Sequence, residues 1–82
     1  MTPKLITICV QTAGRENVMF KLRSDSTLDK LIDKYASSVI NKRPAQLDFI
    51  FEGTKITRKM TPISLGMADN DVIKCVELQH GG

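Results

Sequence analysis

The stretch LDFIFEGTKITRKMTPISLGMADNDVIKCVELQHGG, Leu47 to Gly82, decides the fold of this 82-residue chain. Its first five residues alternate apolar and polar side chains, as a half-buried strand does, and Gly53 turns the chain into a short second strand. Thr61 is placed to cap a helical turn that has Pro62 at its first position. Residues 72–78 alternate once more. The stretch therefore predicts strand, short strand, helical turn and final strand.

Upstream of this stretch, two further alternating segments predict a β-hairpin. Residues 4–11 (KLITICVQ) and 18–23 (VMFKLR) are rich in β-branched and aromatic side chains at period two, which is typical of strands. The segment between them, TAGREN, contains Gly14 and Asn17, and both residue types favour turns. Two such strands joined by a short glycine-containing loop form a hairpin.

Between the hairpin and Leu47, the apolar period lengthens to three or four residues, which predicts a helix. The apolar stripe of residues 24–40 consists of Leu28, Leu31, Ile32, Tyr35 and Val39. Ser26, with Asp29 three residues later, resembles a capping box at the start of this helix. Pro44 ends any helix before it.

The order of these elements predicts an α+β protein with a β-grasp (ubiquitin-like) fold, ββαββ(3-10)β. One helix lies across one face of a mixed sheet, and the final strand lies in the middle beside the first. We expect three parts: a short N-terminal extension (1–4), the β-grasp domain (5–78) and a flexible C-terminal Gly-Gly tail (79–82). By alternation, Ile50 and Val76 point away from the helix and form a small apolar patch.

Composition argues against several classes of function. The net charge of +3 is modest, the basic residues are spread along the chain, and aromatic side chains are few, so no nucleic-acid partner is expected. No apolar run approaches the length of a membrane span, about 18 residues, so no membrane partner is expected. His80 is the only histidine, and Cys9 and Cys75 are far apart, so no metal site is expected. The two cysteines fall on opposite faces of adjacent strands, which argues against a disulfide and indicates a reducing, intracellular setting.

The opening stretch resembles the SUMO branch of the ubiquitin-like modifiers, and the similarity covers Leu5 to Gly82. The segments ITICV, VMFKLR and LDKLIDKY match the first two strands and the helix of that family. The ordered features that carry the resemblance are Phe51-Glu52-Gly53, Thr61-Pro62, Leu65-Gly66-Met67, Asp71-Val72-Ile73 and the terminal glycine pair.

The resemblance implies a protein modifier of the nucleus and cytoplasm, which is a substrate and not an enzyme, with no catalytic residue. Gly82 would be the acyl donor. Gly81, which has no side chain, would let the tail pass through a narrow enzyme channel. ATP would be used by the activating enzyme, so the chain itself needs no cofactor. The implied partners of the monomer are an activating enzyme, a conjugating enzyme, a SUMO-specific protease and target-protein lysines. Gln79 and His80 would be read in tail recognition, and His80 departs from the small hydroxyl residue usual there.

The resemblance also implies two noncovalent surfaces. One is a groove between the second strand and the helix that binds SUMO-interacting-motif peptides by β-augmentation. Its residues would be Val18, Phe20, Lys21, Leu22, Arg23, Lys30 and Leu31. The other is a conjugating-enzyme surface at Glu52, Gly53 and Asp71. A purely structural interpretation is that the apolar residues of the groove belong to the core and its cations to the solvated surface. Both interpretations can hold together, because the edge of a core can line a groove.

Three alternatives stay open at this point. Ubiquitin itself and its near relatives carry arginine before the terminal glycines, and this tail carries His80. A β-grasp sulfur carrier also ends in Gly-Gly, but the FEG and TPISLGM segments argue against it. A noncovalent SUMO-like interaction domain would not use its terminal glycines at all.

Overall fold

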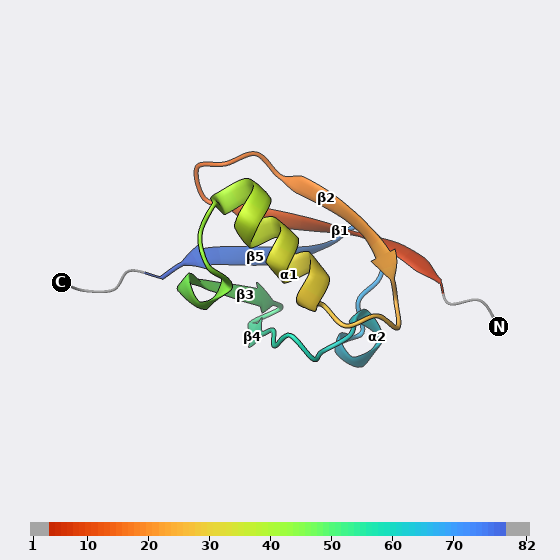
Figure 1. The fold of residues 1–82 in the computed structure, drawn as a ribbon. Coiled ribbons are helices and arrows are strands. Elements are labelled where there is room, and N and C mark those ends of the chain that lie inside the picture. The colour runs from red at the N-terminus through yellow and green to blue at the C-terminus, as the bar shows by residue number, and fades with distance from the viewer. Residues whose placement is uncertain (1–3, 79–82) are drawn as a thin grey trace.

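The computed structural model describes residues 4–78, and the predicted tail residues Gln79, His80, Gly81 and Gly82 lie outside the described residues. Figure 1 shows the course of the chain. The elements are β1 (Leu5–Thr12), β2 (Val18–Arg23), α1 (Asp29–Tyr35), the π-helical η1 (Ala36–Ile40), the 3-10 helix η2 (Pro44–Gln46), β3 (Leu47–Phe51), β4 (Thr54–Lys55), α2 (Pro62–Leu65) and β5 (Asp71–Glu77).

The five strands of the described chain form one mixed sheet in the order β2-β1-β5-β3-β4. β5 pairs parallel to β1, for example Val10 with Ile73, and antiparallel to β3, for example Phe49 with Cys75. The final strand is therefore central and lies beside the first, as the sequence predicts. β2 and β4 are the two edges of the sheet.

Helix α1 crosses one face of the sheet, and the hydrophobic core lies between them (Figure 1). Tyr35 is fully buried at the centre of this core. Its ring makes edge-on contacts with Phe20 and Phe49, at centroid distances of 6.1 and 6.0 Å, a favourable geometry for aromatic pairs. The Tyr35 hydroxyl is hydrogen-bonded to the buried Thr12 hydroxyl, so the one polar group that this ring carries into the core is satisfied.

The predicted capping box at Ser26 is wrong. The N-cap of α1 is Leu28, without a side-chain cap, and the Asp29 carboxylate instead accepts hydrogen bonds from the Thr27 hydroxyl and the Lys30 amide. Leu28 is fully buried, and its amide donates to the Met60 carbonyl at 2.9 Å. The start of the helix is thus set by packing against a distant loop, which a local motif does not reveal.

The second predicted cap is confirmed. The Thr61 hydroxyl accepts a hydrogen bond from the Ser64 amide at 3.1 Å, and Gly66 ends α2 with a φ of +69°. This left-handed conformation favours glycine. The turn that the sequence assigns as 3-10 is a single α-helical turn, and the 3-10 segment is instead η2, where Pro44 begins a short entry into β3.

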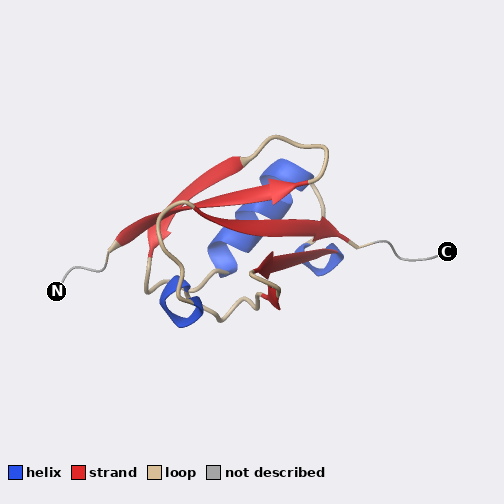
Figure 2. Ribbon diagram, turned by 180° about the vertical axis from the view of Figure 1, so that it is seen from behind, coloured by secondary structure: helices blue, strands red, loops and turns tan. Residues whose placement is uncertain are grey.

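The face of the sheet away from α1, which is turned toward the viewer in Figure 2, carries apolar side chains of β3 and β5. Ile50 is half-buried and Val76 is 46% exposed, which confirms the predicted orientation of both. Cys9 lies on this face, whereas Cys75 belongs to the core, and both are free. Burial raises the pKa of the Cys75 thiol, which keeps it in the unreactive thiol form at neutral pH.

An ion pair connects α1 to the loop that follows β4. The Arg58 guanidinium donates two hydrogen bonds to the Asp33 carboxylate, at 2.5 and 2.7 Å. These bonds lower the pKa of Asp33 below its usual value of 3.8. A depressed carboxyl pKa stabilises the folded state above the unfolded pKa, and this contribution disappears as the pH falls through the folded pKa. Both side chains are half exposed, so solvent screens the interaction.

We therefore expect the melting temperature to fall with pH below about 4, because native carboxylates must then be protonated. Asp25, Asp29 and Glu77 also have lowered pKa values, so they contribute in the same direction. Asp33→Asn should flatten this acid dependence without abolishing it. The check is the melting temperature of both chains by circular dichroism from neutral to acidic pH. Parallel curves would show that the Asp33–Arg58 pair does not contribute.

Candidate functional site

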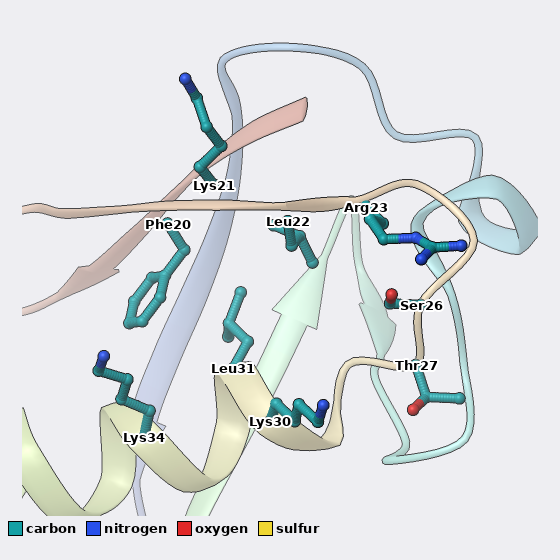
Figure 3. A pocket seen from close by; sticks show the side chains of 9 residues that line it. All are labelled: Phe20, Lys21, Leu22, Arg23, Ser26, Thr27, Lys30, Leu31 and Lys34. Carbon is teal, nitrogen blue, oxygen red and sulfur yellow. The ribbon is translucent and has the colours of Figure 1, made fainter. Parts of the chain in front are cut away.

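A groove runs between the edge strand β2 and helix α1, and we call it the β2–α1 groove (Figure 3). Its volume is about 300 Å³. The apolar floor consists of Phe20, Leu22 and Leu31. Phe20 and Leu22 share a face because they are two positions apart on β2, and Leu31 points at them from the helix (Figure 3). The contact of Phe20 with the core residue Tyr35 fixes the floor at its back.

The rim of the β2–α1 groove is basic, and no carboxylate is among the lining residues that the structure describes. Its cations are Lys21, Arg23, Lys30 and Lys34, all exposed. Arg23 donates to the Asp25 carboxylate at 3.1 Å, and this hydrogen bond lowers the pKa of Asp25. Ser26 and Thr27 complete the lining near the start of α1. An apolar floor beside lysines suits an extended segment with aliphatic side chains and acidic flanks.

The structure brings together six of the seven predicted groove residues. Val18 is not among them: it lies opposite Val10 at the hairpin end of β2 and packs against the core. Lys21 lines the groove, but its side chain points away from Phe20 and Leu22 (Figure 3). Sequence reasoning missed Ser26, Thr27 and Lys34. Lys34 could have been found, since it follows Lys30 by one helical turn.

The predicted conjugating-enzyme surface divides into two parts. Glu52 and Gly53 form the exposed turn between β3 and β4, both with positive φ values of 49° and 80°. They line a hollow of about 370 Å³ together with Ile50, Val72 and Lys74. Asp71 is outside this lining, and its carboxylate accepts a hydrogen bond from the Ala68 amide at 2.8 Å. Asp71 therefore stabilises the turn before β5 at the margin of the hollow.

The described residues contain neither a cluster of metal-binding side chains nor a membrane-spanning helix. Within residues 4–78, no three or more histidine, cysteine, aspartate or glutamate side chains gather as metal ligands would. In the same part of the chain, no helix has the length and apolar character of a membrane span.

Comparison with known proteins decides the family. The sequence model of the Rad60-SLD family, described as "Ubiquitin-2 like Rad60 SUMO-like", matches residues 6–76. The chain belongs to this SUMO-like family. It is 32% identical over 77 residues to the ubiquitin-like protein pmt3/smt3 of Schizosaccharomyces pombe, an alignment that covers 92% of the chain. The chain spans 65% of the length of that relative.

Solved structures support the ubiquitin-like β-grasp fold. The ubiquitin of Caldiarchaeum subterraneum superposes with a TM-score of 0.82 at 20% identity, covering 96% of this chain and 100% of that one. The N-terminal ubiquitin-like domain of the 4931431F19Rik protein superposes with a TM-score of 0.76 at 21% identity, covering 99% and 82%. The family match confirms the resemblance to SUMO seen in the sequence, and these two structures confirm the β-grasp fold.

Proposed function

We propose that this SUMO-like chain is a protein modifier that becomes joined through Gly82 to lysines of target proteins. Membership of the SUMO-like family supports the proposal most directly. The end of the described chain is compatible with it: β5 ends at Glu77, and the Leu78 amide donates to the Gln46 carbonyl at 2.8 Å. The sequence Gln79-His80-Gly81-Gly82 follows directly after this point.

The proposed chemistry takes place at one carboxylate. Gly82 attacks ATP in the activating enzyme, which gives an acyl adenylate and pyrophosphate. An enzyme thiol displaces AMP to form a thioester, a second thiol of the conjugating enzyme takes over the acyl group, and a target lysine amine releases that thiol as the isopeptide forms. The proposal requires a free carboxylate on Gly82, either as the chain's end or after cleavage by a protease.

In this scheme the chain supplies an acyl group and recognition surfaces, and the enzymes supply the catalytic side chains. Two glycines suit the reacting end because they have no Cβ that would obstruct close approach of the backbone. The hollow at Glu52 and Gly53 is the surface we assign to the conjugating enzyme. It lies on the face of the sheet that α1 leaves uncovered, so an enzyme docked there would not block the β2–α1 groove.

A second, noncovalent role is favoured by the β2–α1 groove itself. An extended peptide can pair with the free edge of β2 and place aliphatic side chains on Phe20, Leu22 and Leu31. Acidic residues flanking the apolar segment would then lie near Lys30 and Lys34. The groove would thus recruit SUMO-interacting-motif peptides while Gly82 is attached to a lysine of a target protein.

A charging assay tests the modifier proposal. The chain is incubated with ATP and, in separate reactions, with a SUMO-activating or a ubiquitin-activating enzyme. We expect an ATP-dependent adduct with the SUMO-activating enzyme that disappears on treatment with a thiol reductant. Omission of ATP is the control. No adduct with the SUMO-activating enzyme, together with a sulfur-for-oxygen mass change at the terminus in cells, would instead favour a sulfur carrier.

A further inference from the structure

A second groove lies on the opposite flank of helix α1, beside the edge strand β4. We call it the β4–α1 groove. Its volume is about 680 Å³, within the range of about 300–1,000 Å³ that ligand clefts usually have. The resemblance of the sequence to SUMO did not predict this groove. Its lining residues come from five separate parts of the chain: α1, η2, β3, β4 and the loop that follows β4.

The floor of the β4–α1 groove is apolar and firmly held. It consists of the side chains of Ile32, Leu47, Phe49 and Ile56, each no more than 5% exposed. Ile32 follows Leu31 directly, so α1 sends one apolar side chain into each groove. Phe49 packs edge-on against Tyr35, just as Phe20 does from the other side. Both floors are therefore outer surfaces of one core.

The rim of the β4–α1 groove is basic. Lys55, Arg58 and Lys59 line it, all are exposed, and no carboxylate is among the lining residues. Lys55 pairs with Asp48 at 3.1 Å, and Arg58 pairs with Asp33. Lys59 makes no ion pair within residues 4–78. One uncompensated cation thus stands beside the apolar floor, where a carboxylate of a partner would complement it.

The unpaired edge of β4 favours an extended peptide as the ligand of this groove. β4 is the last strand in the sheet order, and its outer edge pairs with no strand of the described chain. A free sheet edge offers backbone groups to an added extended segment. We propose that the β4–α1 groove binds a short extended peptide of a partner protein, with bulky apolar side chains on the floor and a carboxylate at Lys59. This inference depends neither on conjugation through Gly82 nor on the β2–α1 groove.

The probe for a first test is a short peptide in which leucine and phenylalanine alternate with serine, followed by two aspartates. It is titrated into the ¹⁵N-labelled chain carrying Phe20→Ala, so that binding in the β2–α1 groove is weakened. We expect amide shifts centred on Ile32, Ile56 and Lys59. Shifts confined to β2 and the first turn of α1, or no shifts, would overturn the proposal.

A charge swap makes the test specific. Ala45 also lines the groove. Ala45→Glu with Lys59→Glu should lower the affinity for the aspartate peptide by about fivefold or more, because the two new carboxylates repel the aspartates of the peptide. The same variant should bind a lysine-flanked version of the peptide better than the starting chain does, a gain that a merely structural defect would not produce. Lys74→Glu makes the same kind of charge change on the other face of the sheet and should leave both affinities unchanged.

Two outcomes of these titrations would count against the assignment. Affinity of the double variant within twofold of the starting chain would show that the peptide does not use the groove. Amide shifts of the groove residues that depend on protein concentration without peptide would show that a second copy of the chain occupies it, and that would overturn the assignment to a partner peptide.

Discussion

A chain that lacks Gly81 and Gly82 should form no thioester with the SUMO-activating enzyme under conditions in which the intact chain is fully charged. The reason is steric. The truncated chain ends at His80, whose side chain makes the terminal residue too large for the enzyme channel. The measurement is the amount of reductant-sensitive adduct on a gel. Removal of Met1 and Thr2, the same number of residues from the other end, is the matched control and should leave charging unchanged.

The same truncation separates a modifier from a noncovalent domain. No element of the described fold extends past Glu77, so we expect the melting temperature and peptide binding in the β2–α1 groove to stay as they are. Equal charging of the truncated chain would contradict the role of Gly82. If the intact chain is never charged and the truncated chain keeps its cellular function, the noncovalent interaction domain is the better description.

Most of the fold could be predicted because its elements differ in apolar period. Alternation identifies both ends of β1, β2, β3 and β5 to within one residue, and the stripe through Leu28 and Tyr35 identifies α1. The start of that helix could not be predicted in the same way, since the Leu28 amide is held by Met60, which is distant in sequence. A tertiary contact therefore overrides the local capping pattern of Ser26 and Asp29.

Part of the candidate site could also be predicted from the sequence. Phe20, Leu22 and Leu31 could be placed in one groove because the strand and helix periods, together with the resemblance, put them on facing surfaces. Alternation also implies that Lys21 points away from Phe20, so Lys21 belongs to the rim of the groove and not to its floor. The β4–α1 groove could not be predicted, because it exists only where β4 and η2 are packed beside α1.

Phe20→Ala combined with Lys34→Glu should weaken binding of an acidic-flanked peptide rich in valine and isoleucine by about thirtyfold or more. Truncating an aromatic at the centre of an interface often costs 2 kcal/mol or more, which corresponds to roughly thirtyfold at 25 °C. Reversing a rim charge adds repulsion toward the acidic flank. Both side chains line the groove and lie close together in Figure 3. The measurement is the dissociation constant by isothermal titration calorimetry.

The control variant makes the same two kinds of change on the opposite face of the sheet. Met19→Ala with Lys74→Glu removes an exposed apolar side chain and reverses a lysine, and it should bind the peptide as the native chain does. Phe20 is half-buried, so its truncation lowers stability; the melting temperature of each variant must lie well above the temperature of the titration. Unchanged affinity of a folded Phe20→Ala, Lys34→Glu chain would reject the β2–α1 groove as the peptide site.

A further comparison uses orientation: because the Lys21 side chain points away from the floor, Lys21→Glu alone should cost less affinity than Lys34→Glu alone.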